Sequence, residues 1–199
     1  MNPTQTTTLE YYNKTASDFC TTTISADMSS QMDRFLSRLP DKAFILDFGC
    51  GSGRDTKAFL ERGFLVDAVD GSEELCRAAS NYTGITVRKM LFSELNEVDR
   101  YDGIWACASI LHLPKRELDE VLWKMVAALK KNGTIYTCFK YGDYEGMRGE
   151  RYFTDFTEES LKEFVNGIPE LKILECWVSS DARPERREEK WINILLSRN

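Results

Sequence analysis

The chain has 199 residues, of which 42 % are hydrophobic and 29 % are charged, a composition typical of an ordinary globular domain. Its formal net charge of −6 disfavours broad nucleic-acid binding, which needs clustered lysine and arginine side chains. No apolar run reaches membrane-spanning length, and the polar residues 1–9 lack the pattern of a signal peptide. We therefore expect a cytoplasmic protein.

Strands and helices alternate along the chain, which favours a parallel sheet covered by helices on both faces. The first forty residues are expected to be helical, with an apolar stripe that ends at Pro40. Strands are expected over residues 43–48, 64–69, 85–90, 101–108, 134–140, 171–178 and 191–196. Further helices are expected over residues 55–62, after Ser72, over residues 118–129 with Gly133 as the stop signal, and after Thr157. Residues 141–156 and 179–190 are expected to be loops.

The six cysteines are scattered singly, and none belongs to a C-x-x-C pair. Most lie in apolar stretches, so we expect reduced core residues. One histidine and dispersed acidic residues do not form a ligand set, so no metal site is expected.

The first expected strand is followed by a glycine-rich stretch that opens a helix, Asp47-Phe48-Gly49-Cys50-Gly51-Ser52-Gly53-Arg54-Asp55. Glycines allow a tight turn there and let the backbone approach a bulky ligand. The N–H groups that begin the helix can then face a polar ligand group. Dinucleotide enzymes favour a third glycine where this chain has Arg54. The G-x-G-x-G form with a preceding acid fits a cofactor that has no pyrophosphate.

Asp70 ends the second expected strand, about 20 residues after Gly49. A carboxylate at that place can accept hydrogen bonds from both hydroxyls of a ribose. The alternative is an ordinary acidic residue before the helix cap Ser72. The paired glycine motif and the intervening Gly71 favour the ribose.

Residues 47–55, 69–72 and 101–114 resemble class I S-adenosylmethionine-dependent methyltransferases. Within that class the chain most resembles the small-molecule branch that includes the tellurite-resistance methyltransferases, over residues 11–196. The resemblance implies an α/β, Rossmann-like, doubly wound sheet of seven strands in the order 3-2-1-4-5-7-6, the last strand antiparallel. It also implies one methyltransferase domain over residues 1–199, with an N-terminal helical cap at 1–40 and a Rossmann-like core at 41–199.

The resemblance further implies which residues bind the cofactor. The expected set is Tyr12, Asp47, Gly49, Cys50, Gly51, Gly53, Arg54, Asp55, Asp70, Gly71, Ser72, Met90, Leu91, Ala106 and Ser109. The three glycines would pass under the cofactor and Asp70 would hold the ribose. Met90 and Leu91 would flank the adenine, where many family members have an Asp or Asn, so backbone atoms are expected to bond its amino group. Ala106 would line the methionine end, and Tyr12 would close over it.

His112 follows the fourth expected strand, at the edge of the sheet where open α/β folds bind ligands. Its ordinary pKa of about 6.5 would let it serve as a general base near neutrality. The alternative is a loop histidine that packs near Pro114. Methyl transfer needs a general base only when the acceptor carries a proton. The sequence is therefore also consistent with an enzyme that has no general base.

Residues 140–153 follow the fifth expected strand, and in this family that segment often covers the acceptor. The candidate acceptor-binding residues are Lys140, Tyr141, Arg148, Arg151 and Tyr152. Arg148 and Arg151 can bind an anionic acceptor through bidentate contacts. The alternative is a solvated loop with ordinary charges.

The expected function is transfer of a methyl group from S-adenosylmethionine to a small molecule, releasing S-adenosylhomocysteine, by a monomer or dimer without nucleic-acid or membrane partners. One alternative is a non-catalytic protein that binds S-adenosylmethionine as a sensor or subunit. A second is a NAD(P)-dependent oxidoreductase, which Arg54 and Asp47 disfavour.

Overall fold

The computed structural model describes residues 3–199, so residues 1 and 2 of the predicted 1–40 cap lie outside the described residues. The strands are β1 (Phe44–Phe48), β2 (Leu65–Asp70), β3 (Arg88–Lys89), β4 (Tyr101–Ala106), β5 (Leu129–Lys140), β6 (Glu145–Arg148), β7 (Arg151–Thr154), β8 (Leu171–Ser180) and β9 (Lys190–Arg198). The helices are α1 (Pro3–Thr23), α2 (Ser29–Leu36), α3 (Arg54–Glu61), α4 (Glu73–Thr83), α5 (Lys115–Ala128) and α6 (Glu158–Asn166), with 3-10 turns η1 (Phe92–Glu94), η2 (Ile110–His112) and η3 (Pro184–Arg186).

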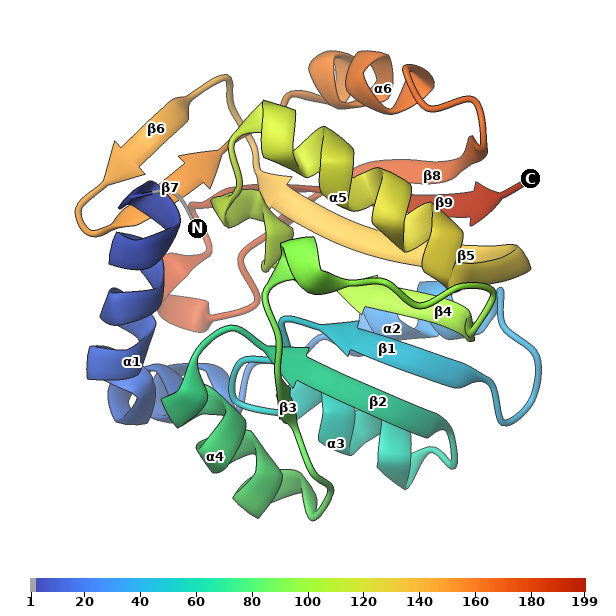
Figure 1. The fold of residues 1–199 in the computed structure, drawn as a ribbon. Coiled ribbons are helices and arrows are strands. Elements are labelled where there is room, and N and C mark those ends of the chain that lie inside the picture. Colours follow the sequence, from blue (N-terminus) through green and yellow to red (C-terminus); the bar gives the residue numbers. More distant parts are fainter. Residues whose placement is uncertain (1–2) are drawn as a thin grey trace.

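The described residues form a seven-stranded sheet in the order β3-β2-β1-β4-β5-β9-β8 (Figure 1). The strands from β3 to β5 pair in parallel, and β9 pairs antiparallel with both β5 and β8. This is the predicted order with the last strand antiparallel, so the predicted fold class is confirmed. Among residues 3–199, no helix combines the length and apolar character needed to cross a membrane.

Helices cover both faces of the sheet because successive strand residues point to opposite sides. Leu46 and Ile104 belong to the apolar cluster beneath α5 and α6. Their neighbours Ile45 and Trp105 belong to the cluster on the other face, beneath α2 and α3. Figure 1 shows α5 and α6 together on one face of the sheet, with α1 standing across its edge. The side chain of Ser72 accepts a hydrogen bond from the N–H of Leu75, so the predicted cap of α4 is confirmed.

Two predicted boundaries near the sheet were wrong. The third strand is only Arg88–Lys89, where residues 85–90 were predicted. Gly133 does not stop α5, because the backbone becomes extended at Leu129, which pairs with Tyr101 and begins β5. The early start could not be seen in the sequence, because residues 130–132 are exposed and the start of a strand that faces water carries no apolar pattern.

Residues 141–156 are not a loop, as the sequence had predicted, but contain the hairpin β6-β7. Arg148 pairs with Arg151, and Gly149 has the positive φ of 61° that a two-residue turn requires. The hairpin is held by its buried end, where the hydroxyl of Thr154 donates to the carbonyl of Leu113 at 2.7 Å. The many glycines and charges of this segment masked its strands.

Candidate active site

A cavity of about 250 Å³ lies at the carboxyl ends of the central strands. Its walls come from α1, the glycine-rich turn after β1, the end of β2, the segments after β3 and β4, β7 and the connection between β8 and β9. Parallel α/β sheets bind ligands at this edge, where the strand order reverses between β1 and β4. The cavity is therefore the candidate active site.

The glycine-rich turn brings bare backbone to the cavity. Gly49 has a φ of +88°, and a Cβ there would lie 2.5 Å from the Cβ of Ser109. Any other residue would therefore strain the turn and collide with the segment after β4. Gly53 has a different role, because it begins α3 in the left-handed conformation and lets α4 pack closely. A Cβ at Gly53 would lie 2.9 Å from Thr83.

Asp70 is buried at the end of β2 and faces the glycine-rich turn. One carboxylate oxygen accepts a hydrogen bond from the N–H of Gly51 at 2.9 Å, and the other accepts from the N–H of Ser72 at 2.8 Å. Burial raises the pKa of this carboxyl, and the backbone N–H groups partly offset that rise. A carboxylate can accept about four hydrogen bonds, so Asp70 keeps acceptor capacity that neighbouring hydroxyls of a ligand can use.

Arg54 and the acids beside it form a closed network. Asp55 accepts bonds from two nitrogens of Arg54, at 2.6 and 2.8 Å, and from the indole N–H of Trp105 at 2.8 Å. Asp47 accepts a bond from Thr56 at 2.5 Å. Burial, followed by the carboxylate of Asp55, raises the pKa of Asp47. The network fixes the start of α3 under the turn and leaves the charge of Arg54 neutralised.

His112 lies in the cavity wall with both ring nitrogens engaged. Its Nδ1 lies 2.6 Å from the carbonyl oxygen of Tyr152, which can only accept, so Nδ1 carries the proton. Its Nε2 therefore accepts from the hydroxyl of Tyr12, at 2.8 Å. Burial is the main reason that the pKa of His112 falls to about 4, and the nearby charge of Arg151 also lowers it. The imidazole is neutral near pH 7, in a single tautomer.

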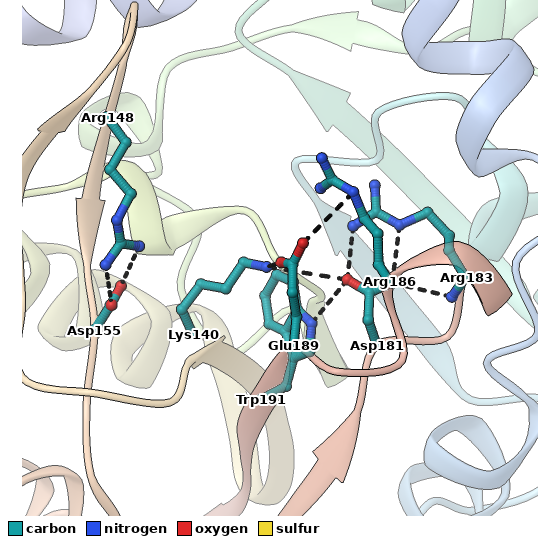
Figure 2. Close-up of polar contacts among 8 residues, drawn as sticks. All are labelled: Lys140, Arg148, Asp155, Asp181, Arg183, Arg186, Glu189 and Trp191. Carbon is teal, nitrogen blue, oxygen red and sulfur yellow. Dashed lines mark hydrogen bonds and ion pairs between the residues drawn. The ribbon is translucent and has the colours of Figure 1, made fainter.

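The connection between β8 and β9 forms a charged wall that the sequence did not predict (Figure 2). Asp181 is buried and accepts bonds from Arg183 at 2.7 Å and from the indole of Trp191 at 3.0 Å. Lys140 pairs with Glu189 and lies 4.3 Å from the centre of the Trp191 ring. Residues 179–190 had been predicted to be a solvated loop. Their mixed acidic and basic residues are typical of such a loop and gave little indication that the segment lines a cavity.

The structure brings most of the predicted residues to one cavity. Those that line it are Tyr12, Asp47, Gly49, Cys50, Gly51, Arg54, Asp55, Asp70, Gly71, Met90, Leu91, Ser109, His112, Lys140 and Arg151. Those that do not line it are Gly53, Ser72, Ala106, Tyr141, Arg148 and Tyr152. Within residues 3–199, no group of three or more potential ligands could hold a metal ion.

Residues 45–133 match a family described as a methyltransferase domain. That segment contains the glycine-rich turn, Asp70 and the first four strands of the central sheet. The match gives the segment around the glycine-rich turn the sequence pattern of a methyltransferase domain, and the sheet has the strand order predicted for a Rossmann-like methyltransferase fold.

Known and uncharacterized methyltransferases are similar to part of this chain. The chain is 34 % identical over 125 residues to human N-terminal Xaa-Pro-Lys N-methyltransferase 1, a match that spans 56 % of this chain and only 56 % of that protein. It is 28 % identical over 160 residues to an uncharacterized methyltransferase of Geobacillus thermodenitrificans, over 74 % of each chain.

Solved structures of methyltransferases share the fold. The 1,6-didemethyltoxoflavin-N1-methyltransferase of Burkholderia thailandensis, with bound 1,6-didemethyltoxoflavin and S-adenosylhomocysteine, has a TM-score of 0.73 and 23 % identity, covering 96 % of this chain and 85 % of that one. Magnesium protoporphyrin IX methyltransferase of Synechocystis, with bound S-adenosylmethionine, has a TM-score of 0.74 and 16 % identity, covering 100 % of this chain and 99 % of that one. At these identities the likeness concerns the fold.

Proposed function

We propose that this protein transfers a methyl group from S-adenosylmethionine to a small-molecule acceptor and releases S-adenosylhomocysteine. We propose further that residues 1–199 act as one domain, in which the 1–40 segment caps the 41–199 core. The observation that carries the proposal is Asp70. Its two oxygens keep acceptor capacity in a cavity beside a turn that has no room for a Cβ at Gly49.

The residues present fit this cofactor. The two hydroxyls of a ribose need paired acceptors, which Asp70 offers. The parts of the cofactor next to the ribose need a backbone that they can approach closely, which the glycine-rich turn offers. We propose that Met90 and Leu91 flank the adenine and that Tyr12 and Ser109 border the methionine end. When bound, S-adenosylmethionine supplies a methyl group on a sulfonium, an electrophile with a good leaving group. The protein's part is then to align the acceptor and exclude water.

Tyr12 and His112 can remove a proton from an acceptor that carries one. In this proposal the oxygen of Tyr12 takes the acceptor's proton while its own proton passes to Nε2 of His112. The short contact between Oη and Nε2 and the fixed tautomer support this route. The low pKa of His112 keeps Nε2 unprotonated and able to accept near pH 7, but it also makes the ring a weak base, so the carbonyl of Tyr152 at Nδ1 has to stabilise the charge formed during transfer. His112 therefore acts through Tyr12.

The cofactor is tested by calorimetric titration with S-adenosylhomocysteine, with NAD as the control ligand. We expect saturable binding of S-adenosylhomocysteine alone, strongly weakened in Asp70→Asn. Binding of NAD alone would contradict the proposal and favour an oxidoreductase.

Catalysis is tested by release of S-adenosylhomocysteine with a panel of acceptors. The resemblance to tellurite-resistance methyltransferases places tellurite and selenite in that panel, beside carboxylates, amines and thiols. Turnover with any acceptor that falls in Tyr12→Phe supports the enzyme. Binding without turnover across the panel would favour the sensor or subunit.

A further inference from the structure

Arg151 differs from the other basic side chains of the cavity. Those others are neutralised by carboxylates: Arg54 by Asp55, Lys140 and Arg186 by Glu189, and Arg183 by Asp181. Arg151 forms no ion pair within residues 3–199. The one hydrogen bond of its guanidinium there is a long contact of 3.4 Å to the hydroxyl of Tyr12. A guanidinium has five N–H donors, so most donors of this cavity-lining side chain have no partner within residues 3–199.

Aromatic rings hold this guanidinium in place. Its central carbon lies 4.8 Å from the ring centre of Tyr11, 5.1 Å from that of Phe153 and 5.9 Å from that of Tyr12. Rings that stack on the faces of a guanidinium leave its N–H edge free for a planar, bidentate partner. A partly buried cation without a counter-ion is costly, and a ligand with a negative charge would remove that cost.

The position of Arg151 ties such a ligand to the reaction. Arg151 contacts the same Tyr12 hydroxyl that bonds His112. A ligand group bound at Arg151 therefore lies next to the proposed proton acceptor. Phe153, whose ring is 4.8 Å from that of His112, adds an apolar surface beside it.

We propose that Arg151 anchors a carboxylate of the methyl acceptor, so that the acceptor is an organic anion with an apolar or aromatic body. The inference rests on the proposed function and names its substrate class. Arg148, which lies directly opposite Arg151 in the hairpin, has no part in this site. Its guanidinium is paired with the buried Asp155, away from the charged wall (Figure 2).

The test uses the full chain saturated with S-adenosylhomocysteine and titrated with benzoate, with benzamide as the neutral probe. We expect benzoate to bind wild type and Arg148→Gln alike, and to bind Arg151→Gln about tenfold or more weakly, the loss of one charge-assisted pair. Benzamide should not distinguish the variants. Arg148→Gln leaves a buried carboxylate unpaired and disturbs the hairpin more than Arg151→Gln does, so a general effect on the hairpin would weaken binding in both.

A second titration separates the two possible sources of the carboxylate, because the cofactor's methionine end carries one of its own. S-adenosylhomocysteine is compared with methylthioadenosine, which lacks the amino-acid group. If Arg151→Gln weakens S-adenosylhomocysteine but not methylthioadenosine, Arg151 serves the cofactor and the inference is wrong. It is also wrong if benzoate fails to bind wild type, or binds Arg151→Gln equally well. Failure of S-adenosylhomocysteine to bind wild type would instead overturn the proposed function.

Discussion

His112 offers a quantitative test of the site, because the chain has a single histidine. Its pKa falls from an ordinary 6.5 to about 4 in the folded protein. Below pH 6.5, His112 therefore binds a proton in the unfolded chain, whereas in the folded chain it binds one only near pH 4. The stability that the folded protein has with a neutral His112 is therefore fully present above pH 6.5 and is lost as the pH falls toward 4.

The size of the effect follows from proton linkage. Between pH 7 and pH 5 this one group should cost the folded state about 2 kcal/mol of unfolding free energy. We expect urea unfolding of wild type to lose that amount relative to His112→Gln over the same interval, since other titrating groups are common to both proteins. An NMR titration of the tag-free protein should show the histidine ring still neutral at pH 5.5. Parallel stability curves, or a ring that titrates near pH 6.5, would refute a buried neutral His112.

Three further substitutions test the cofactor end and the core. Gly49→Ala should reduce binding of S-adenosylhomocysteine at least tenfold, because its Cβ meets Ser109 at 2.5 Å; unchanged calorimetric affinity would show that the turn does not approach the ligand. Asp70→Asn should weaken the same binding by about 1.5–3 kcal/mol, the worth of a charged hydrogen bond, and equal affinities would remove Asp70 from the ribose. Phe35→Ala removes a fully buried ring between α2 and the sheet and should cost about 3–5 kcal/mol in urea unfolding; a loss under 1 kcal/mol would mean that α2 repacks.

The glycine-rich turn and Asp70, which we propose bind the cofactor, could be brought to one edge of the sheet from the sequence because their signals are local. The strand, the glycine-rich turn and α3 are consecutive, and the glycines are required by backbone geometry within that short stretch. Asp70 was found by the same logic, since adjacent parallel strands end at one edge of a sheet. No local signal indicates the order of the strands, which was predicted from the resemblance alone.

Residues packed through distant contacts were predicted less well. Residues 1–40 were predicted to be helical, but what α1 contributes to the cavity depends on single contacts such as the bond from Tyr12 to His112, a hundred residues away in the chain. The charged wall depends on Asp181, whose burial beside Trp191 has no periodic signature. Sequence patterns report faces and turns, whereas these contacts exist only once the layers have packed.

Arg148 and Arg151 show most directly where prediction from the sequence stops. Both are arginines of one segment, and the sequence offers no reason to prefer either as an acceptor-binding residue. In the hairpin they even form one cross-strand pair. Their environments differ because Asp155 follows β7 and neutralises Arg148, while α1 brings two tyrosine rings to Arg151. The chemical difference between a structural cation and the cation that we propose binds a ligand thus depends on a helix more than a hundred residues away, and only the folded chain reveals it.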